Sequence, residues 1–235
     1  MQVARAAGRP WRSEAGWAGA WIGDRGALTN PVILVQPMSD PTVVLDEVDE
    51  LFAPHVPYFL ISPWPTPDLR SHGLELLGHP PLMVRFPAVR HVPTWPGVEV
   101  QEVRNADELA IAERILVEGY PMPDIEPLTA GGLLGPSILQ ASIRVWIGSV
   151  DGRPASVAAA HLHAGATLVE YVAALTTARG RGAGAAVTWA ATLVDRRHPQ
   201  SWSPATTGAR STRRWAIRPS SDGLSGSGRR APRRW

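Results

Sequence analysis

The chain lacks cysteine and lysine, and each absence excludes a kind of chemistry. Without cysteine, its 235 residues form no disulfide and supply no cysteine nucleophile or thiolate metal site. Without lysine there is no Walker loop, because that loop uses a lysine to reach the phosphates of a nucleotide. All 23 basic residues are arginine, which together with abundant Ala, Gly and Pro indicates a GC-rich coding sequence. The lack of cysteine fits a reducing cytoplasm, the location we predict.

Long apolar runs are lacking too. No run reaches the ~18 residues that a membrane-spanning helix requires. The first 21 residues carry scattered arginines but no continuous apolar core and no cleavage pattern, so we predict neither membrane insertion nor export. With 44% hydrophobic residues, a chain of this length can bury one large core or two small ones.

Charge is unevenly placed along the chain. Residues 1–200 hold 15 Arg against 20 Asp and Glu, whereas residues 201–235 hold 8 Arg and one Asp. The body is therefore acidic and only the tail is basic. A nucleic-acid partner would depend on the last 35 residues alone, and we do not expect one for the body.

The most informative segment lies between residues 169 and 191. VEYVAALTTA at 169–178 reads as a strand, RGRGAG at 179–184 as a glycine-dense turn, and AAVTWAA at 185–191 as a helix. Unpaired backbone N–H groups and the positive end of a helix converge at such a turn, so it predicts a phosphate site. The order R-x-x-G-x-G is not the G-x-G-x-x-G of dinucleotide-binding folds.

The elements before this turn complete a recognisable order. Residues 144–150 and 153–163 read as strands joined at Asp151-Gly152, and Ala164-Gly165 makes the next turn into a third strand at 167–175. A helix at 106–119 precedes them. We therefore predict an antiparallel meander that leads directly into the glycine loop.

This order, with R-x-x-G-x-G after a strand and before a helix, resembles the GNAT (general control non-repressible related) N-acetyltransferases over about residues 98–200. The resemblance implies an α/β fold with a mixed sheet flanked by helices. It also implies acetyl-CoA as co-substrate and direct attack by a primary amine, without a metal. The acceptor would be a small-molecule or peptide amine; its identity stays open, as does dimerisation.

The resemblance also implies where acetyl-CoA binds. The strand end at 172–174 would separate from its neighbour and pair with the pantetheine arm, while backbone N–H groups at 180–185 hold the pyrophosphate. Gly182 and Gly184 would let phosphate oxygens approach without a Cβ in the way. The side chains of Arg179 and Arg181 could point either to the phosphates or to solvent, and both alternatives stay open. The predicted cofactor-binding residues are Val172, Ala173, Ala174, Arg179, Gly180, Arg181, Gly182, Ala183, Gly184 and Ala185.

Catalytic candidates are fewer. Glu170 is the candidate general base because it lies on the strand that leads into the cofactor cleft, although a solvated or salt-bridged surface glutamate is the alternative. His161 and His163, two apart on one strand face, have the spacing of a two-histidine metal site, but no third ligand is evident and we predict no metal. The segment with Tyr120, Met122 and Asp124 falls where acceptors enter GNAT clefts, or is simply a loop.

Residues 27–86 show an order of predicted strands and helices similar to that expected of a GNAT C-terminal half, but they lack the R-x-x-G-x-G motif. The pattern predicts strands at 32–36, 57–62 and 82–86, with helices at 41–52, capped by Asp40, and at 67–78. This resembles the degenerate half of a tandem acetyltransferase, and an unrelated α/β extension is the alternative. We predict domains at 1–95 and 98–200, joined by a proline-rich linker at 87–97 and followed by the tail at 201–235.

The tail shows no periodicity and is predicted to be largely irregular. Its three tryptophans are unusual for a disordered segment, and a shifted reading frame can be written LVASDDGRPVYEALGYPAVERWTLWLR, a plausible GNAT C-terminus. We hypothesise a frameshift near Gln200, which gene sequencing would test. The family's usual general acid, a tyrosine on the lost helix, then has no match.

That loss leaves two alternatives to an active enzyme. One is a pseudoenzyme that binds coenzyme A without turnover; the other is an unrelated α/β body with an Arg-rich tail that binds nucleic acid. A missing strand would also expose a sheet edge, so poor solubility is expected.

Overall fold

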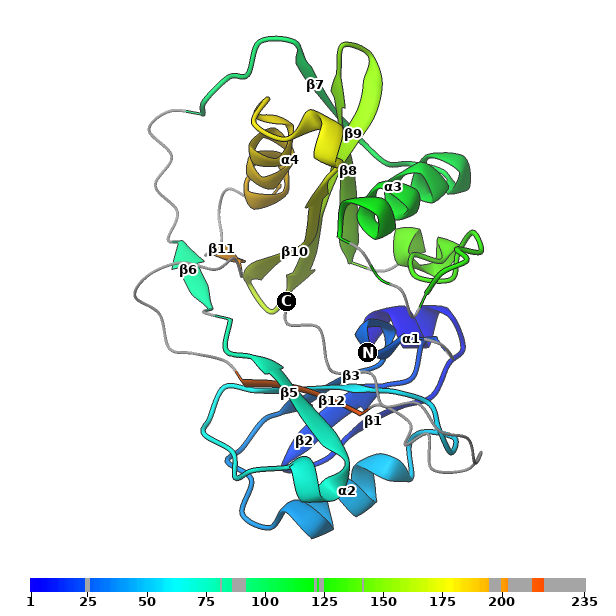
Figure 1. Cartoon of the computed structure of the whole chain (residues 1–235), viewed down its shortest axis with the longest axis vertical. Helices are drawn as coiled ribbons and strands as arrows, with labels where there is room; N and C mark the ends of the chain where they lie inside the picture. Colours follow the sequence, from blue (N-terminus) through cyan, green and yellow to red (C-terminus); the bar gives the residue numbers. More distant parts are fainter. Residues whose placement is uncertain are drawn as a thin grey trace, which may run out of the picture.

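The computed structural model describes residues 1–23, 26–80, 82–85, 92–120, 122, 125–140, 142–194, 200–202 and 213–217. They form two six-stranded sheets, one in each half of the molecule (Figure 1). The N-terminal sheet has the order β1-β2-β3-β4-β12-β5 and the C-terminal sheet the order β6-β11-β10-β9-β8-β7. None of the described helices has the length and hydropathy of a membrane span.

The bounds of the elements are as follows. The strands of the N-terminal sheet are β1 Trp11–Ser13, β2 Trp17–Ala20, β3 Pro31–Leu34, β4 Phe59–Ser62, β12 Arg213–Ile217 and β5 Leu74–Gly78; those of the C-terminal sheet are β6 Met83–Arg85, β11 Gln200–Trp202, β10 Ala166–Ala174, β9 Arg153–His163, β8 Ile143–Val150 and β7 Val98–Glu102. The helices are α1 Gln2–Ala6, α2 Pro41–Asp49, α3 Ala106–Gly119 and α4 Ala183–Thr192, with short 3-10 turns η1 Ala27–Thr29, η2 Arg70–His72, η3 Pro136–Gln140 and η4 Thr176–Ala178.

The C-terminal sheet is covered on both faces. Helices α3 and α4 lie on opposite faces of this sheet (Figure 1). Because side chains alternate along a strand, β9 contributes Val157 and Ala159 to the core under α3, and Ala158 and Ala160 to the core under α4. Helix α3 begins where the sequence predicts, since the side chain of Asn105 accepts a hydrogen bond from the Glu108 amide at 2.9 Å. The predicted three-strand meander is confirmed.

The N-terminal sheet is packed against α2. Trp17, Leu34 and Leu60 from the strands meet Leu45 and Val48 of the helix in one buried cluster. The Asp40 side chain caps α2 by accepting from the Thr42 amide at 2.9 Å, as predicted.

Both halves contain the same unit. In each, two adjacent parallel strands are connected through a helix, as β3-α2-β4 in the first half and β10-α4-β11 in the second. An antiparallel strand then pairs with the far edge of the second parallel strand, β12 with β4 and β6 with β11. The predicted α/β class, with a mixed sheet preceded by a related half, is confirmed.

These two antiparallel strands are exchanged between the halves. Strand β12 comes from the C-terminal tail but lies between β4 and β5, while β6 precedes the linker but pairs with β11 (Figure 1). The sheet edge that a missing strand was expected to expose is partly covered, because β11 pairs with β10 over Thr167–Val169 and β6 pairs with β11. The division into domains at residues 87–97 stays a proposal, with two segments that cross it.

One predicted element is wrong. Residues 67–78, expected as a helix, form η2 and then strand β5. Gly73, with φ of +79°, reverses the chain after η2, and β5 then pairs with β12, a partner about 140 residues later that local periodicity does not reveal. The tail at 201–235 was expected to be irregular, but it contains most of strand β11 and all of strand β12. The other residues of the tail lie outside the described part of the chain.

Candidate active site

The exit of strand β10 has one unpaired edge. Strand β10 pairs with β9 as far as Ala174, but its other edge pairs with β11 only over Thr167–Val169. Between Glu170 and Ala173 a β-bulge inserts one extra residue, and Tyr171 there has φ of +54°. Beyond Val169, described strands leave this edge open, so alternate backbone groups of residues 172–174 face outward, ready to pair with an extended ligand.

The glycine loop ends at the start of α4, where several backbone N–H groups lie next to one another. Gly182 is the N-cap of α4 with φ of +86°, and the first intrahelical bond runs from the Ala186 amide to the Gly182 carbonyl at 2.9 Å. The amides of residues 182–185 have no hydrogen-bond acceptor among the described residues, and the first turn contains no acidic side chain. With the positive end of the helix dipole, this arrangement suits an anion.

The corresponding helix of the first half is different. At the start of α2, the Asp40 carboxylate already accepts from the Thr42 amide, and the preceding segment at 35–40 has no glycine. A negative charge therefore stands where a phosphate would need donors. The geometry favours one anion site, in the second half.

Arg179 and Arg181, for which two orientations were open, both contact protein. Arg179 donates from Nη2 to the Gly119 carbonyl at 3.2 Å, which ties the end of α3 to the loop. Arg181 pairs through Nη2 with Asp151 Oδ2 at 2.6 Å, in the turn between β8 and β9. Each contact uses only Nη2 of a guanidinium with five N–H donors, so a phosphate contact would not require either bond to break.

Two glycines near the loop are required by close packing. A Cβ on Gly119 would lie 3.1 Å from the carbonyl carbon and oxygen of Ala174, so only glycine lets α3 approach the end of β10 so closely. A Cβ on Gly182 would overlap the indole of Trp95. By contrast, a Cβ on Gly184 would meet the Ala174 Cβ at an ordinary 3.7 Å. The sequence analysis did not identify Gly119 or Trp95.

Glu170 and the two histidines share the α3 face of the sheet. Leu168 lies opposite His161 and Glu170 opposite Ala159, whose side chain is in the α3 core. Glu170 is half-buried. Its position beside the bulge is compatible with the predicted role as base, which stays a prediction.

The histidine pair is bridged by Gln2 of α1. The side-chain nitrogen of Gln2 lies 3.1 Å from Nδ1 of His163. The side-chain oxygen of Gln2 lies 3.3 Å from Nε2 of His161. Burial, then the positive charge of the Met1 amino group, lowers the pKa of His161. Within the described part of the chain, no three His, Asp or Glu side chains gather to hold a metal.

The three tyrosines differ in accessibility. Burial, then Asp49, raises the pKa of Tyr58 in the first half, and burial followed by the charge of Glu170 raises the pKa of Tyr171 in the bulge. Tyr120 is 62% exposed and follows Gly119 at the end of α3, next to the exit of β10. Met122 is buried in the core, and Asp124 lies outside the described residues.

Glu113 was missed by the sequence analysis. It is fully buried on α3, and its carboxylate accepts from the amides of Gly131, Leu133 and Leu134 at 2.8, 2.6 and 3.0 Å. It thereby fixes the loop that follows the acceptor-side segment. A signal was present, since Glu113 lies four residues after Leu109 and three before Leu116, on the apolar stripe of the helix.

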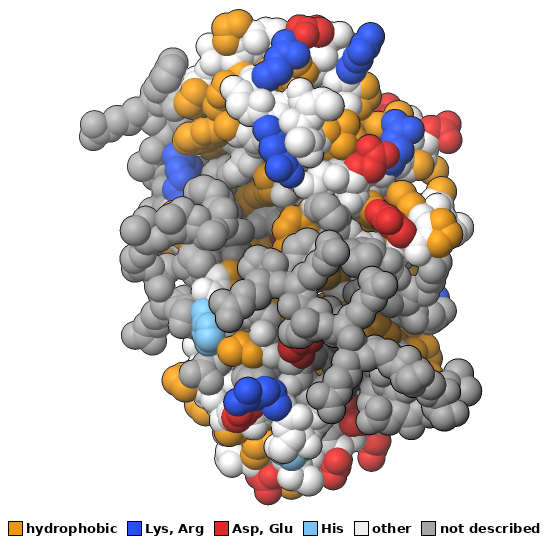
Figure 2. Space-filling view, viewed as in Figure 1, with side chains coloured by type: hydrophobic (Ala, Val, Ile, Leu, Met, Phe, Trp, Pro, Cys, Tyr) orange, Lys and Arg blue, Asp and Glu red, His pale blue; other side chains and the backbone are white. Residues whose placement is uncertain are grey.

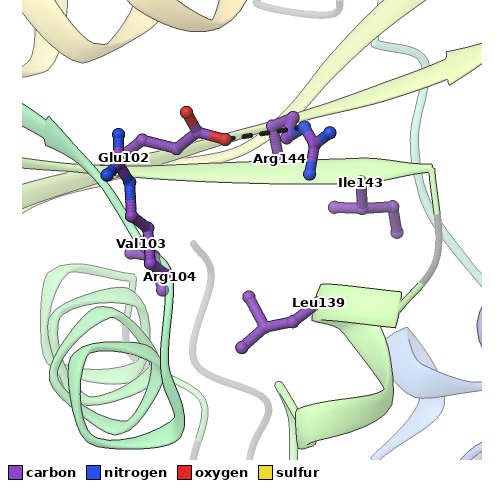
Figure 3. Close-up of a pocket in the computed structure, with 6 residues that line it drawn as sticks. All are labelled: Glu102, Val103, Arg104, Leu139, Ile143 and Arg144. Atoms are coloured by element: carbon purple, nitrogen blue, oxygen red, sulfur yellow. Dashed lines mark ion pairs between the residues drawn. The ribbon is translucent and has the colours of Figure 1, made fainter.

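A cavity of about 280 Å³ opens between the end of β7, the start of β8 and η3 (Figure 3). Within it, Glu102 and Arg144 form an ion pair at 3.5 Å. Its wall residue Ile143 lies opposite His161, so the cavity is one strand away from the histidine pair. None of its lining residues was predicted from sequence; they are Glu102, Val103, Arg104, Leu139, Ile143 and Arg144.

Comparisons with solved structures identify the fold. A GCN5-related N-acetyltransferase from Kribbella flavida superposes with a TM-score of 0.63 and 22% identity, over 93% of this chain and 96% of its own. A GNAT-family acetyltransferase from Novosphingobium aromaticivorans gives 0.55 and 14%, over 92% and 96%. A GCN5-related N-acetyltransferase from Sphaerobacter thermophilus gives 0.53 and 16%, over 88% and 78%.

The chain thus has the GNAT fold, and the resemblance inferred from residues 98–200 is confirmed and extends over most of its length. No family model and no curated protein matches the sequence.

Proposed function

We propose that the chain is an acetyl-CoA-dependent N-acetyltransferase whose single cofactor site lies in the second half. The observation that carries this proposal is the juxtaposition of four unpaired amides, at residues 182–185, with the open edge of β10. A diphosphate needs several converging donors, and a pantetheine arm needs an unpaired strand edge. The GNAT fold brings both to one place.

The residues present fit the chemistry of direct transfer. Acetyl-CoA supplies a thioester; the acceptor amine forms a C–N bond to its carbonyl carbon, the C–S bond breaks, and the amine loses a proton. Glu170, directly or through water, accepts that proton. Outward-facing backbone N–H groups after the bulge stabilise the negative charge that develops on the carbonyl oxygen. The leaving thiolate takes a proton from solvent or from Tyr120, the exposed tyrosine at this mouth.

A thiol-release assay tests the proposal. We expect acetyl-CoA to raise the Tm of the full chain, and a panel of small-molecule and peptide amines to include one that releases free coenzyme A thiol. Glu170→Gln should lower kcat by roughly 10²–10⁴-fold without abolishing the Tm shift, since general-base catalysis contributes about that much. Absence of any Tm shift would contradict the proposal.

The tyrosines favour a second candidate, a pseudoenzyme that binds coenzyme A without turnover. Tyr58 is buried and Tyr171 is partly buried, both with raised pKa values, and the third, Tyr120, is not on the helix where the family carries its general acid. A Tm shift without thiol release across the panel would support this candidate. Location in the cytoplasm, an amine acceptor and dimerisation remain predictions of the same proposal.

Nucleic-acid binding through the tail is the remaining alternative. On the face that Figure 2 shows, basic and acidic side chains of the described residues are interspersed instead of forming one basic patch. Steeply salt-dependent DNA binding that disappears on deletion of residues 201–235 would favour it.

A further inference from the structure

Trp95, in the segment between the two halves, packs directly on the glycine loop. A Cβ added to Gly182 would lie 2.7 Å from Cγ and 2.9 Å from Nε1 of the indole, and closer still to Cδ1. The five-membered ring edge of Trp95, which carries the N–H, therefore fills the space that a side chain at residue 182 would need. No other residue comes closer to the place of that Cβ.

The position of Trp95 is fixed from two sides. Its carbonyl accepts from the Val98 amide at 3.1 Å, which closes a tight turn onto β7. Within that turn the Gly97 carbonyl accepts from the Asp151 amide at 3.2 Å, and the Asp151 side chain holds Arg181 of the glycine loop. The turn at 95–98, the β8–β9 turn and the glycine loop thus form one connected group.

The indole N–H of Trp95 is a hydrogen-bond donor without an acceptor among the described residues. Trp95 is half-buried, and its Nε1 has no hydrogen-bond partner among the described residues. It lies beside Gly182, the first of the four amides that also lack acceptors. Five donors and a helix dipole, beside an Asp151 carboxylate that is already paired with Arg181, match a ligand with several anionic oxygens close together, which a diphosphate is.

We propose that Trp95 is a binding residue for the diphosphate of coenzyme A, to which its indole N–H donates while the ring edge holds Gly182 in its left-handed conformation. The proposal rests on the cofactor site proposed above. It makes the segment between the halves part of that site, so that cofactor affinity depends on a residue outside the R-x-x-G-x-G motif.

Isothermal titration calorimetry of the full chain tests this. Trp95→Phe keeps an aromatic ring and removes the N–H, and should weaken coenzyme A binding about tenfold, the worth of one hydrogen bond to a charged group. Trp95→Phe should weaken the binding of dephospho-coenzyme A by the same factor, because that ligand keeps the diphosphate and lacks only the 3′-phosphate. Trp64→Phe, another half-buried tryptophan in the first half, should bind like wild type.

Trp95→His, which restores a ring N–H on a smaller ring, should bind more tightly than Trp95→Phe. Histidine fills this space less well than phenylalanine, so tighter binding by Trp95→His cannot come from a more stable fold. The Tm without ligand measures the stability of each variant separately. Equal or tighter binding by Trp95→Phe than by wild type would overturn the proposal, as would His binding no better than Phe. A wild-type chain that binds no coenzyme A would instead overturn the proposed function itself.

Discussion

At the scale of single residues, Glu113 shows how a buried charge can organise a loop. Its two carboxylate oxygens accept three backbone N–H bonds from residues 131–134, and no cation is needed because three aligned donors satisfy it. The loop follows the segment that contains Tyr120 and Met122, which the resemblance predicts to border the acceptor entrance. Glu113 is therefore a positioning residue for that loop.

Glu113→Gln should lower the free energy of unfolding by about 2–3 kcal/mol, because one carboxylate oxygen becomes an NH₂ that faces backbone donors and leaves them unsatisfied. Urea denaturation measures this. Glu118→Gln on the same helix is the matched control: its side chain is 57% exposed and its contact with Arg114 is 4.0 Å, so the change should stay within about 0.5 kcal/mol. Equal effects of the two variants would contradict the role of Glu113.

Gly182→Ala should both destabilise the fold and weaken coenzyme A binding. A φ of +86° costs an L-residue about 1–2 kcal/mol, and the new methyl group would displace Trp95. We expect a loss of that size in chemical denaturation and at least a tenfold loss of affinity by calorimetry.

Gly184→Ala is the control for Gly182→Ala. Its Cβ would make an ordinary contact with Ala174 of β10, and alanine is a better helix former than glycine within α4, so stability should be unchanged or rise by roughly 0.5–1 kcal/mol. If Gly182→Ala were equally harmless, the loop would not have the conformation described.

At the scale of secondary-structure elements, the bulge in β10 and the exchange of β6 and β12 have the largest consequences. After Val169 no described strand pairs with β10 on its β11 side, and the bulge lies in the segment that follows, so within the described residues the edge at 172–174 is open. The exchange puts a strand from beyond residue 200 into the N-terminal sheet. Folding of the first half therefore depends on the end of the chain.

Ala216→Pro tests this dependence, because proline removes a backbone N–H from β12, where Ala216 pairs with Phe59 on one side and Glu75 on the other. Hydrogen exchange should become faster in β4 and β5 and stay unchanged in β9. Ser225→Pro, beyond β12 in the tail, is the control and should change neither. Unchanged protection of β4 and β5 in Ala216→Pro would show that the strand pairing is absent in solution.

At the scale of the whole molecule, the two halves share a topology but differ at the start of one helix. The amides at the start of α4 have no acceptor among the described residues, whereas the Asp40 side chain already occupies the same place in the first half. We expect calorimetry to give one coenzyme A per chain. A second equivalent of bound coenzyme A would show that the first half also retains a site.

Much of this organisation was visible in the sequence because it is local. The Asp40 cap, the Asp151-Gly152 turn and the strand-loop-helix order around residues 169–191 each depend on neighbours a few residues away. The predicted helix at 67–78 failed for the opposite reason. Strand β5 exists through pairing with β12, and this contact between distant segments outweighs local propensity.

The sequence by itself determined the meander, the glycine loop and the helix that follows it, since backbone sterics and alternation act over short range. Only the tertiary structure decided which amides stay unpaired, where the two loop arginines go, and that Trp95 and Gly119 border the loop. Those outcomes depend on contacts between residues 30 to 90 positions apart. Such contacts form when sheets and helices pack, and no periodicity along the chain records them.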